Sequence, residues 1–155
     1  MMDLTRAKGT WEQLKVKLPD ILSTYQADVD VAESRLALRG KTGAEALKEQ
    51  TGYSAYYGMR KAEINKLLKY LDGQVSACRS RLYVGYNKSD RALGDREREK
   101  YINNEPEYLS YHELYLEVEE LRDKFSAICD AWTARGFSIR DWTQLKIASQ
   151  HDDPI

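Results

Sequence analysis

Two stretches of the chain repeat apolar residues at alternating intervals of three and four positions. Side chains at this heptad spacing fall on one face of a helix, and that face needs a second apolar surface to cover it. No strand-like alternation accompanies the two stretches. The sequence therefore predicts an all-α fold, in which long heptad-patterned helices pack as a helical hairpin or bundle. The repeating residues are Ile64, Leu68, Leu71, Val75, Cys78 and Leu82, followed by Tyr111, Leu114, Val118, Leu121, Phe125, Ile128 and Trp132.

Shorter helices are predicted before the first heptad stretch. Thr10 and Gln13 form a capping-box pattern, which predicts a first helix that ends at Pro19. A second helix is expected over residues 20–39, with Gly40 after its end.

A glycine- and tyrosine-rich stretch, GKTGAEALKEQTGYSAYYGMR, occupies residues 40–60. Its four glycines favour turns, so we expect only a short helix over residues 44–50 and then a loop through Gly58. A long polar connection is expected over residues 85–109, with a short helix within GDREREKYINN.

The second heptad stretch is expected to begin with a capping box at Ser110 and Glu113 and to end at Gly136. A separate short C-terminal helix is then predicted over residues 138–149. Its apolar stripe is too narrow to be stable alone. The pattern leaves open whether this helix packs on its own chain or on a second subunit. The apolar residues of this region are Phe137, Ile139, Trp142 and Leu145.

The formal net charge of −1 conceals two oppositely charged segments. Residues 60–91 hold eight basic and three acidic side chains, whereas residues 95–130 hold five basic and eleven acidic ones. A segment of this kind can present a local positive surface to a polyanion. The alternative, that the basic and acidic segments pair with each other, stays open.

Cations and tyrosines gather where the first heptad stretch ends, in RSRLYVGYNKSDR at residues 79–91. Arginine and lysine bind phosphates, and tyrosine rings stack on unpaired bases of any sequence. The pattern therefore predicts a single-stranded nucleic-acid site. An alternative is that the arginines only complement the negative end of the helix dipole. We call these six residues the Arg–Tyr cluster: Arg79, Arg81, Tyr83, Tyr86, Lys88 and Arg91.

Catalytic and metal-binding patterns are poor. His112 and Glu113 lack the HExxH spacing or paired cysteines of a zinc site. GKT at residues 40–42 lacks the earlier glycine of a phosphate-binding loop. We therefore expect no enzyme, no metal and no cofactor.

The two cysteines, Cys78 and Cys129, lie on apolar helix faces. We expect buried free thiols in a reducing compartment, with a disulfide between the two faces as the minority alternative. The first residues carry no apolar segment of a signal peptide, and no apolar run approaches the ~20 residues that span a membrane. A cytoplasmic protein without a membrane contact is expected.

Two motifs resemble the UvsY family of phage recombination mediator proteins. The first motif lies within residues 121–145, where its most specific residues are Arg135-Gly136-Phe137 and Ile139-Arg140. The second is RSRL at residues 79–82, which is similar to the family's basic–small–Arg–Leu motif. The motifs occur in the family's order with an acidic helix between them, and the resemblance covers about residues 60–147. The stretch 40–58 has no counterpart in the family pattern, and the connection over residues 85–105 is longer and more charged.

The resemblance implies a non-enzymatic, helical, homo-oligomeric protein that binds single-stranded DNA. Such a protein helps a RecA-like recombinase to displace single-strand-binding protein, in the cytoplasm of an infected bacterial host. It implies DNA binding by Arg79 and Arg81 and self-association through the apolar residues of 137–145. Residues 1–136 would then be the DNA-binding region and 137–155 the oligomerisation helix and tail, within one compact domain overall. The rival is a helical adaptor that binds only proteins, with Arg79 and Arg81 paired to the acids of residues 113–123.

Overall fold

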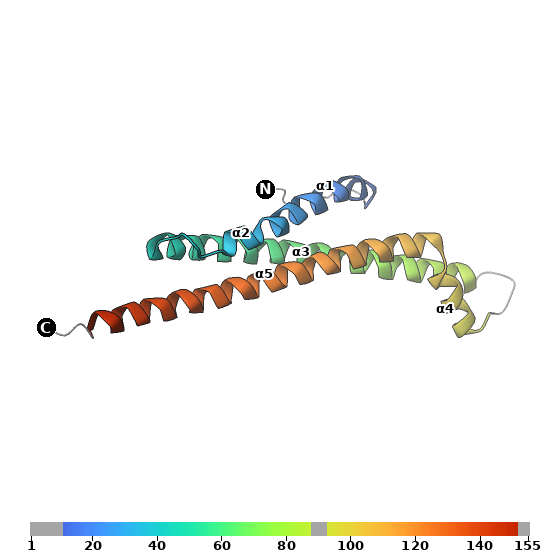
Figure 1. Cartoon of the computed structure of the whole chain (residues 1–155). Helices are drawn as coiled ribbons and strands as arrows, with labels where there is room; N and C mark the ends of the chain where they lie inside the picture. Colours follow the sequence, from blue (N-terminus) through green and yellow to red (C-terminus); the bar gives the residue numbers. More distant parts are fainter. Residues whose placement is uncertain (1–10, 88–92, 152–155) are drawn as a thin grey trace. The chain divides into compact units, whose positions relative to one another are not determined.

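The computed structural model describes residues 11–87 and 93–151, and the regular elements in those ranges are all α-helices (Figure 1). The prediction of an all-α fold is confirmed. Two compact units divide the chain, one made of Met1–Ala62 with Asp123–Ile155 and the other of Glu63–Arg122. The helices are α1 (Trp11–Asp30), α2 (Ala32–Leu36), α3 (Gly43–Asn87), α4 (Asp95–Asn103) and α5 (Pro106–His151).

The first unit is built around aromatic rings from three helices. Tyr57 of α3 is fully buried, and its ring stacks on that of Trp132 of α5 with 6.2 Å between centroids. Phe125 of α5 lies 5.9 Å from Tyr57 and meets the edge of Tyr25 of α1 at 5.9 Å. Because aromatic side chains bury large apolar areas, these four rings hold α1, α3 and α5 together.

The second unit pairs the C-terminal part of α3 with the N-terminal part of α5, joined through α4 (Figure 1). Apolar side chains of all three helices are buried in it, and burial raises the pKa of the Cys78 thiol. Cys78 and Cys129 are both free thiols. The buried residues of this unit are Ile64, Leu67, Leu68, Leu71, Cys78, Ile102, Val118 and Leu121.

Pro19 does not end the first helix, contrary to the prediction. It lies inside α1, which continues to Asp30. A proline within a helix costs about 3 kcal/mol, since it removes a backbone hydrogen bond. Leu18, Ile21 and Leu22 are buried on either side of it, and their packing outweighs that cost. The second helix expected over residues 20–39 is therefore the end of α1 followed by the short α2.

The loop expected through Gly58 is also absent from the described chain, because α3 is one continuous helix from Gly43. The helix begins with a capping box, formed by Thr42-Gly43-Ala44-Glu45. The Thr42 hydroxyl accepts from the N–H of Glu45 at 3.3 Å, and the Glu45 carboxylate accepts from the N–H of Thr42 at 2.8 Å. The carboxylate accepts from the Thr42 N–H and also from the Thr42 hydroxyl at 3.0 Å, and these two bonds lower the pKa of Glu45. Among the glycines that the structure describes, only Gly40, with φ +80°, has the left-handed conformation of a turn.

Two boundaries of the last helix differ from the prediction as well. α5 begins at Pro106 rather than Ser110, because proline suits the first position of a helix. It continues through Gly136, so no separate helix begins at Ser138. A Cβ at Gly136 would lie 3.1 Å from Nε2 of Gln50, so this glycine permits a close approach of α3 rather than a helix end. The functional division expected at residue 136 falls inside α5 and stays a prediction.

The short helix expected in the polar connection is confirmed as α4. None of the helices in residues 11–87 and 93–151 has an apolar stretch sufficient to cross a membrane.

Candidate nucleic-acid interface

The four described members of the Arg–Tyr cluster lie at the C-terminal end of α3, in the second unit. The side chains of Arg79 and Arg81 keep 43% and 60% of their surface exposed. Tyr83 and Tyr86 are half-buried. Lys88 and Arg91 lie outside the described residues. Four of the six predicted site residues are therefore brought together on one helix end.

Both arginines of the cluster are paired with acids. Arg79 lies 3.8 Å from the carboxylate of Glu99 in α4, with its guanidinium 5.9 Å from the ring centroid of Tyr108. Arg81 forms an ion pair with Glu107 in the first turn of α5. Both partners, Glu99 and Glu107, belong to the acidic segment 95–130, as the alternative of pairing between the two segments expected, but they are not among the acids of residues 113–123.

Both tyrosines also contact the region around α4. The Tyr83 hydroxyl donates to Asp95 at 3.0 Å and accepts from Arg98 at 3.1 Å. The Tyr86 hydroxyl donates to Glu105, which raises the pKa of Tyr86. The Tyr86 ring stacks on Tyr101 with 5.9 Å between centroids. All four described members of the cluster are therefore engaged by residues 95–108.

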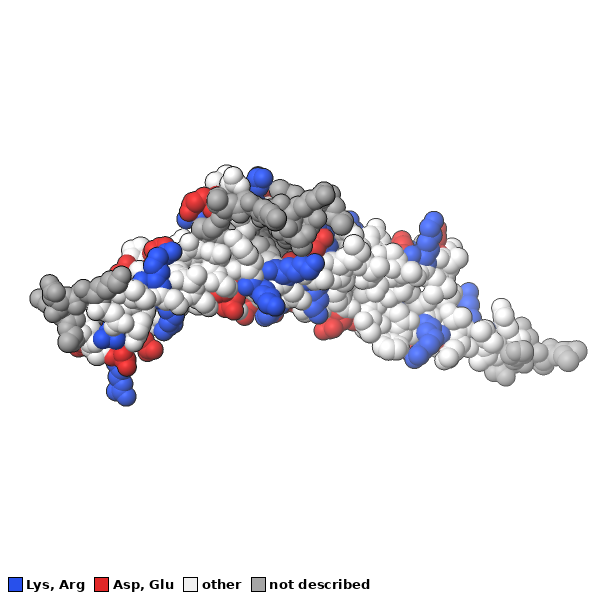
Figure 2. Space-filling view, turned by 180° about the vertical axis from the view of Figure 1, so that it is seen from behind, with Lys and Arg blue, Asp and Glu red and all other residues white. Residues whose placement is uncertain are grey.

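The lysine and arginine side chains do not form one continuous positive patch on the face drawn in Figure 2. Lysine and arginine side chains stand there in small groups, with acidic side chains close to them. Single exposed charges of this kind exchange partners readily, since ion pairs in water are worth only about 0–1 kcal/mol.

The predicted self-association residues have different environments in the first unit. Ile139 is buried, and Trp142 packs against the start of α3, where a Cβ on Gly43 would lie 3.0 Å from its ring. Trp142 and Ile139 also line a cavity of about 330 Å³ between these segments. Phe137 and Leu145 are exposed. Ile139 therefore packs within its own chain, and the other three side chains keep surface available.

Arg135 is a residue whose role the sequence patterns did not reveal. Its side chain is only 4% exposed, and its guanidinium donates to the carbonyls of Leu36 at 3.0 Å and Ala46 at 3.1 Å. It also donates to Gln50 and to the Glu49 carboxylate, each at 3.1 Å. Arg135 thereby joins α5 to the end of α2 and the start of α3. In the sequence, Arg135 stood out only as part of the Arg135-Gly136-Phe137 motif, which says nothing of its partners.

A second charged group joins α1 to α3. The Asp28 carboxylate accepts from the Tyr56 hydroxyl at 2.7 Å and lies 3.1 Å from Arg60 and 3.7 Å from Arg35. The Tyr57 hydroxyl donates to the Asp28 carbonyl at 2.9 Å. The tyrosines of the Gly/Tyr stretch therefore have structural partners, which a loop would not have given them.

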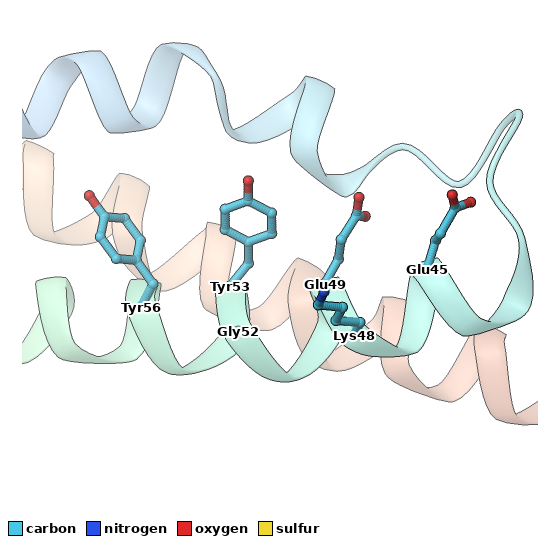
Figure 3. Close-up of a pocket in the computed structure, with 6 residues that line it drawn as sticks. All are labelled: Glu45, Lys48, Glu49, Gly52, Tyr53 and Tyr56. Atoms are coloured by element: carbon cyan, nitrogen blue, oxygen red, sulfur yellow. The ribbon is translucent and has the colours of Figure 1, made fainter.

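A cavity of about 520 Å³ adjoins the N-terminal part of α3 (Figure 3). Figure 3 shows Glu45, Glu49, Tyr53 and Tyr56 on one side of the helix, whereas Lys48 points away from them. Glu49 is already paired with Lys41 at 2.7 Å, and Arg35 covers the Tyr53 ring at 4.9 Å. The polar groups of this cavity are thus largely committed to partners in the chain itself.

No group of three or more potential metal ligands occurs in the part of the chain that the structure describes. His112 stacks on the ring of Tyr108 with 5.8 Å between centroids.

Comparison of the chain with protein-family models, with curated proteins and with solved structures gave no match. The resemblance to the UvsY family therefore rests on the two sequence motifs alone.

Proposed function

We propose that this protein is a recombination mediator of the UvsY type. It binds single-stranded DNA and promotes the loading of a RecA-like recombinase onto strands covered by single-strand-binding protein. The proposal rests on the resemblance over residues 60–147 and on the residues that carry it. It describes a non-enzymatic protein that acts without a cofactor in the cytoplasm of an infected bacterial cell.

The observation that carries the proposal is the grouping of Arg79, Arg81, Tyr83 and Tyr86 at one helix end, with both guanidinium groups partly exposed. Arginine holds backbone phosphates without reading sequence, and base stacking on tyrosine is worth roughly 1–3 kcal/mol per base. The grouping supplies both kinds of contact within about two helical turns. A single strand exposes its bases for such stacking, whereas a duplex does not.

Self-association is the second part of the proposal. One such cluster binds weakly, and a homo-oligomer would repeat it, so that linked sites raise the effective local concentration of the strand. The exposed side chains of Phe137, Trp142 and Leu145 are the proposed contact surface between subunits.

The experiment that tests DNA binding is fluorescence anisotropy with a labelled single-stranded oligonucleotide and its duplex, titrated across salt. The proposal predicts tighter binding of the single strand, with a log–log salt slope of about −0.7 per phosphate contacted. It also predicts that Arg79→Ala/Arg81→Ala weakens binding. Absence of binding to either substrate at low salt would refute the proposal.

The rival function, a helical adaptor that binds only proteins, is favoured by one observation. Arg79 and Arg81 already have carboxylate partners in Glu99 and Glu107. If those pairs are purely structural, the double arginine variant loses stability, and neither variant nor wild type binds DNA at physiological salt. The same titration therefore distinguishes the two functions.

A further inference from the structure

Residues 95–108 contact every described member of the Arg–Tyr cluster. Each of these four residues meets a carboxylate of this segment, and Tyr83 also accepts from Arg98. Arg79 pairs with Glu99, and Arg81 with Glu107. Tyr83 donates to Asp95, and Tyr86 donates to Glu105. We call residues 95–108 the covering segment.

The covering segment offers the two chemical groups that a single strand would offer. Its carboxylates stand at the guanidinium groups, where phosphate oxygens would bind, and both anions accept charge-assisted hydrogen bonds. Its aromatic rings stand where bases would stack. The Tyr101 ring stacks on Tyr86 at 27° between planes, and the Tyr108 ring lies against Arg79.

We propose that the covering segment is an intramolecular competitor of single-stranded DNA, which the strand displaces when it binds the described members of the cluster, namely Arg79, Arg81, Tyr83 and Tyr86. This inference rests on the proposed function and adds a regulation of the same site. Displacement requires only that side chains of the segment rotate away from the arginines and tyrosines. The competitor holds the affinity of each subunit low, which suits a mediator that must hand the strand to a recombinase.

The geometry of the pairs allows such an exchange. The Glu99 and Glu107 side chains are 61% and 49% exposed, so both carboxylates regain water when they leave the arginines. Ion pairs in this setting are screened by salt and contribute little to folding. α4 stays attached meanwhile, because Ile102 is fully buried and takes no part in the pairs.

The competitor is tested with two double variants of identical charge. Glu99→Gln/Glu107→Gln removes the carboxylates at the arginines. Glu97→Gln/Glu113→Gln removes two exposed carboxylates from the same two helices, and neither of these contacts the cluster within the described residues. Both variants change the net charge by +2, so any general electrostatic gain is common to them. Far-ultraviolet circular dichroism checks that both remain helical.

The expected result is that Glu99→Gln/Glu107→Gln binds a labelled single strand about fivefold more tightly than Glu97→Gln/Glu113→Gln at one low salt concentration, as the loss of exposed ion pairs would give. Equal single-strand affinities of the two glutamine variants would refute the proposal that the covering segment competes with DNA. If they are equal while Arg79→Ala/Arg81→Ala still weakens binding, the proposed function stands without it. If no protein in the set binds DNA, both proposals fall.

Discussion

Arginines stand in opposite environments in the two units of this protein. Arg135, in the first unit, is almost completely buried and donates to two backbone carbonyls, an amide oxygen and a carboxylate. Arg79 and Arg81, in the second unit, are partly exposed, and each pairs with a single glutamate. A buried charge with every partner supplied by the fold is fixed in place. An exposed charge with one screened partner is free to exchange it for a phosphate.

The largest expected effect on stability comes from Arg135→Ala. Removal of this side chain takes one donor from each of the Leu36 and Ala46 carbonyls, and because a hydrogen bond to a charged group contributes about 1.5–3 kcal/mol, a loss of about 3 kcal/mol or more is expected. Urea unfolding followed by circular dichroism measures the loss. Arg140→Ala is the matched control, because Arg140 lies in the same helix, is exposed, and contacts only surface groups, namely the carboxylate of Asp141 and the exposed ring of Phe137, among the described residues. The control should change stability by less than about 0.5 kcal/mol.

A smaller effect is expected beside Arg135, at Gly136. A leucine there would displace Gln50, whose side-chain amide donates to the Trp132 carbonyl at 2.7 Å. Overpacking of this kind costs about 1–3 kcal/mol. Gly73→Leu is the control, since nothing lies within 4 Å of a Cβ at that position. Equal unfolding midpoints for the two variants would show that Gly136 is not a close contact.

The self-association surface is tested by Trp142→Glu and Leu145→Glu. Trp142 packs on Gly43 of its own chain, so Trp142→Glu lowers both the stability of the first unit and the size of the oligomer. Leu145 is 70% exposed, so Leu145→Glu should reduce the oligomer with little change in unfolding. Sedimentation velocity measures the size. An unchanged sedimentation coefficient for both variants would remove residues 142 and 145 from the interface.

A small effect on stability is also expected for Arg79→Ala/Arg81→Ala. Exposed ion pairs contribute about 0–1 kcal/mol each, so the unfolding free energy should fall by less than about 2 kcal/mol. A loss as large as that expected for Arg135→Ala would mean that the Arg–Tyr cluster is a structural element, and the contrast between the two regions would disappear.

The helical fold class could be predicted from the sequence, and so could most of the apolar helix faces that are buried. Val118, Leu121 and Phe125 are heptad positions, and all three are buried. Helix ends were less predictable, because Pro19 and Gly136 have local preferences that tertiary packing overrides. Gly136 resembles a helix end in the sequence, yet its lack of a side chain serves the contact with Gln50. The capping box at Thr42 and Glu45 was visible in the sequence and would have placed the start of α3.

In the candidate site, too, local features could be predicted from the sequence, whereas features that depend on tertiary packing could not. Arg79, Arg81, Tyr83 and Tyr86 lie within eight positions, so their proximity follows from the helix alone. Their partners Glu99 and Glu107 depend on how α4 and α5 return along α3, which no local pattern specifies. Arg135 was harder still, because its acceptors are backbone carbonyls about 90–100 residues away, and backbone groups leave no mark on sequence composition.

The measurement that tests the central claim most directly is the salt dependence of single-stranded DNA binding for two variants that each lose two positive charges from α3. Arg79→Ala/Arg81→Ala removes the proposed phosphate contacts, and Lys66→Ala/Lys69→Ala removes two exposed lysines elsewhere on the helix. We predict that the arginine variant alone loses affinity about tenfold or more, with its log–log slope shallower by about 1.4 for two lost phosphate contacts. Equal losses in both variants would contradict a specific site and leave only general electrostatic attraction.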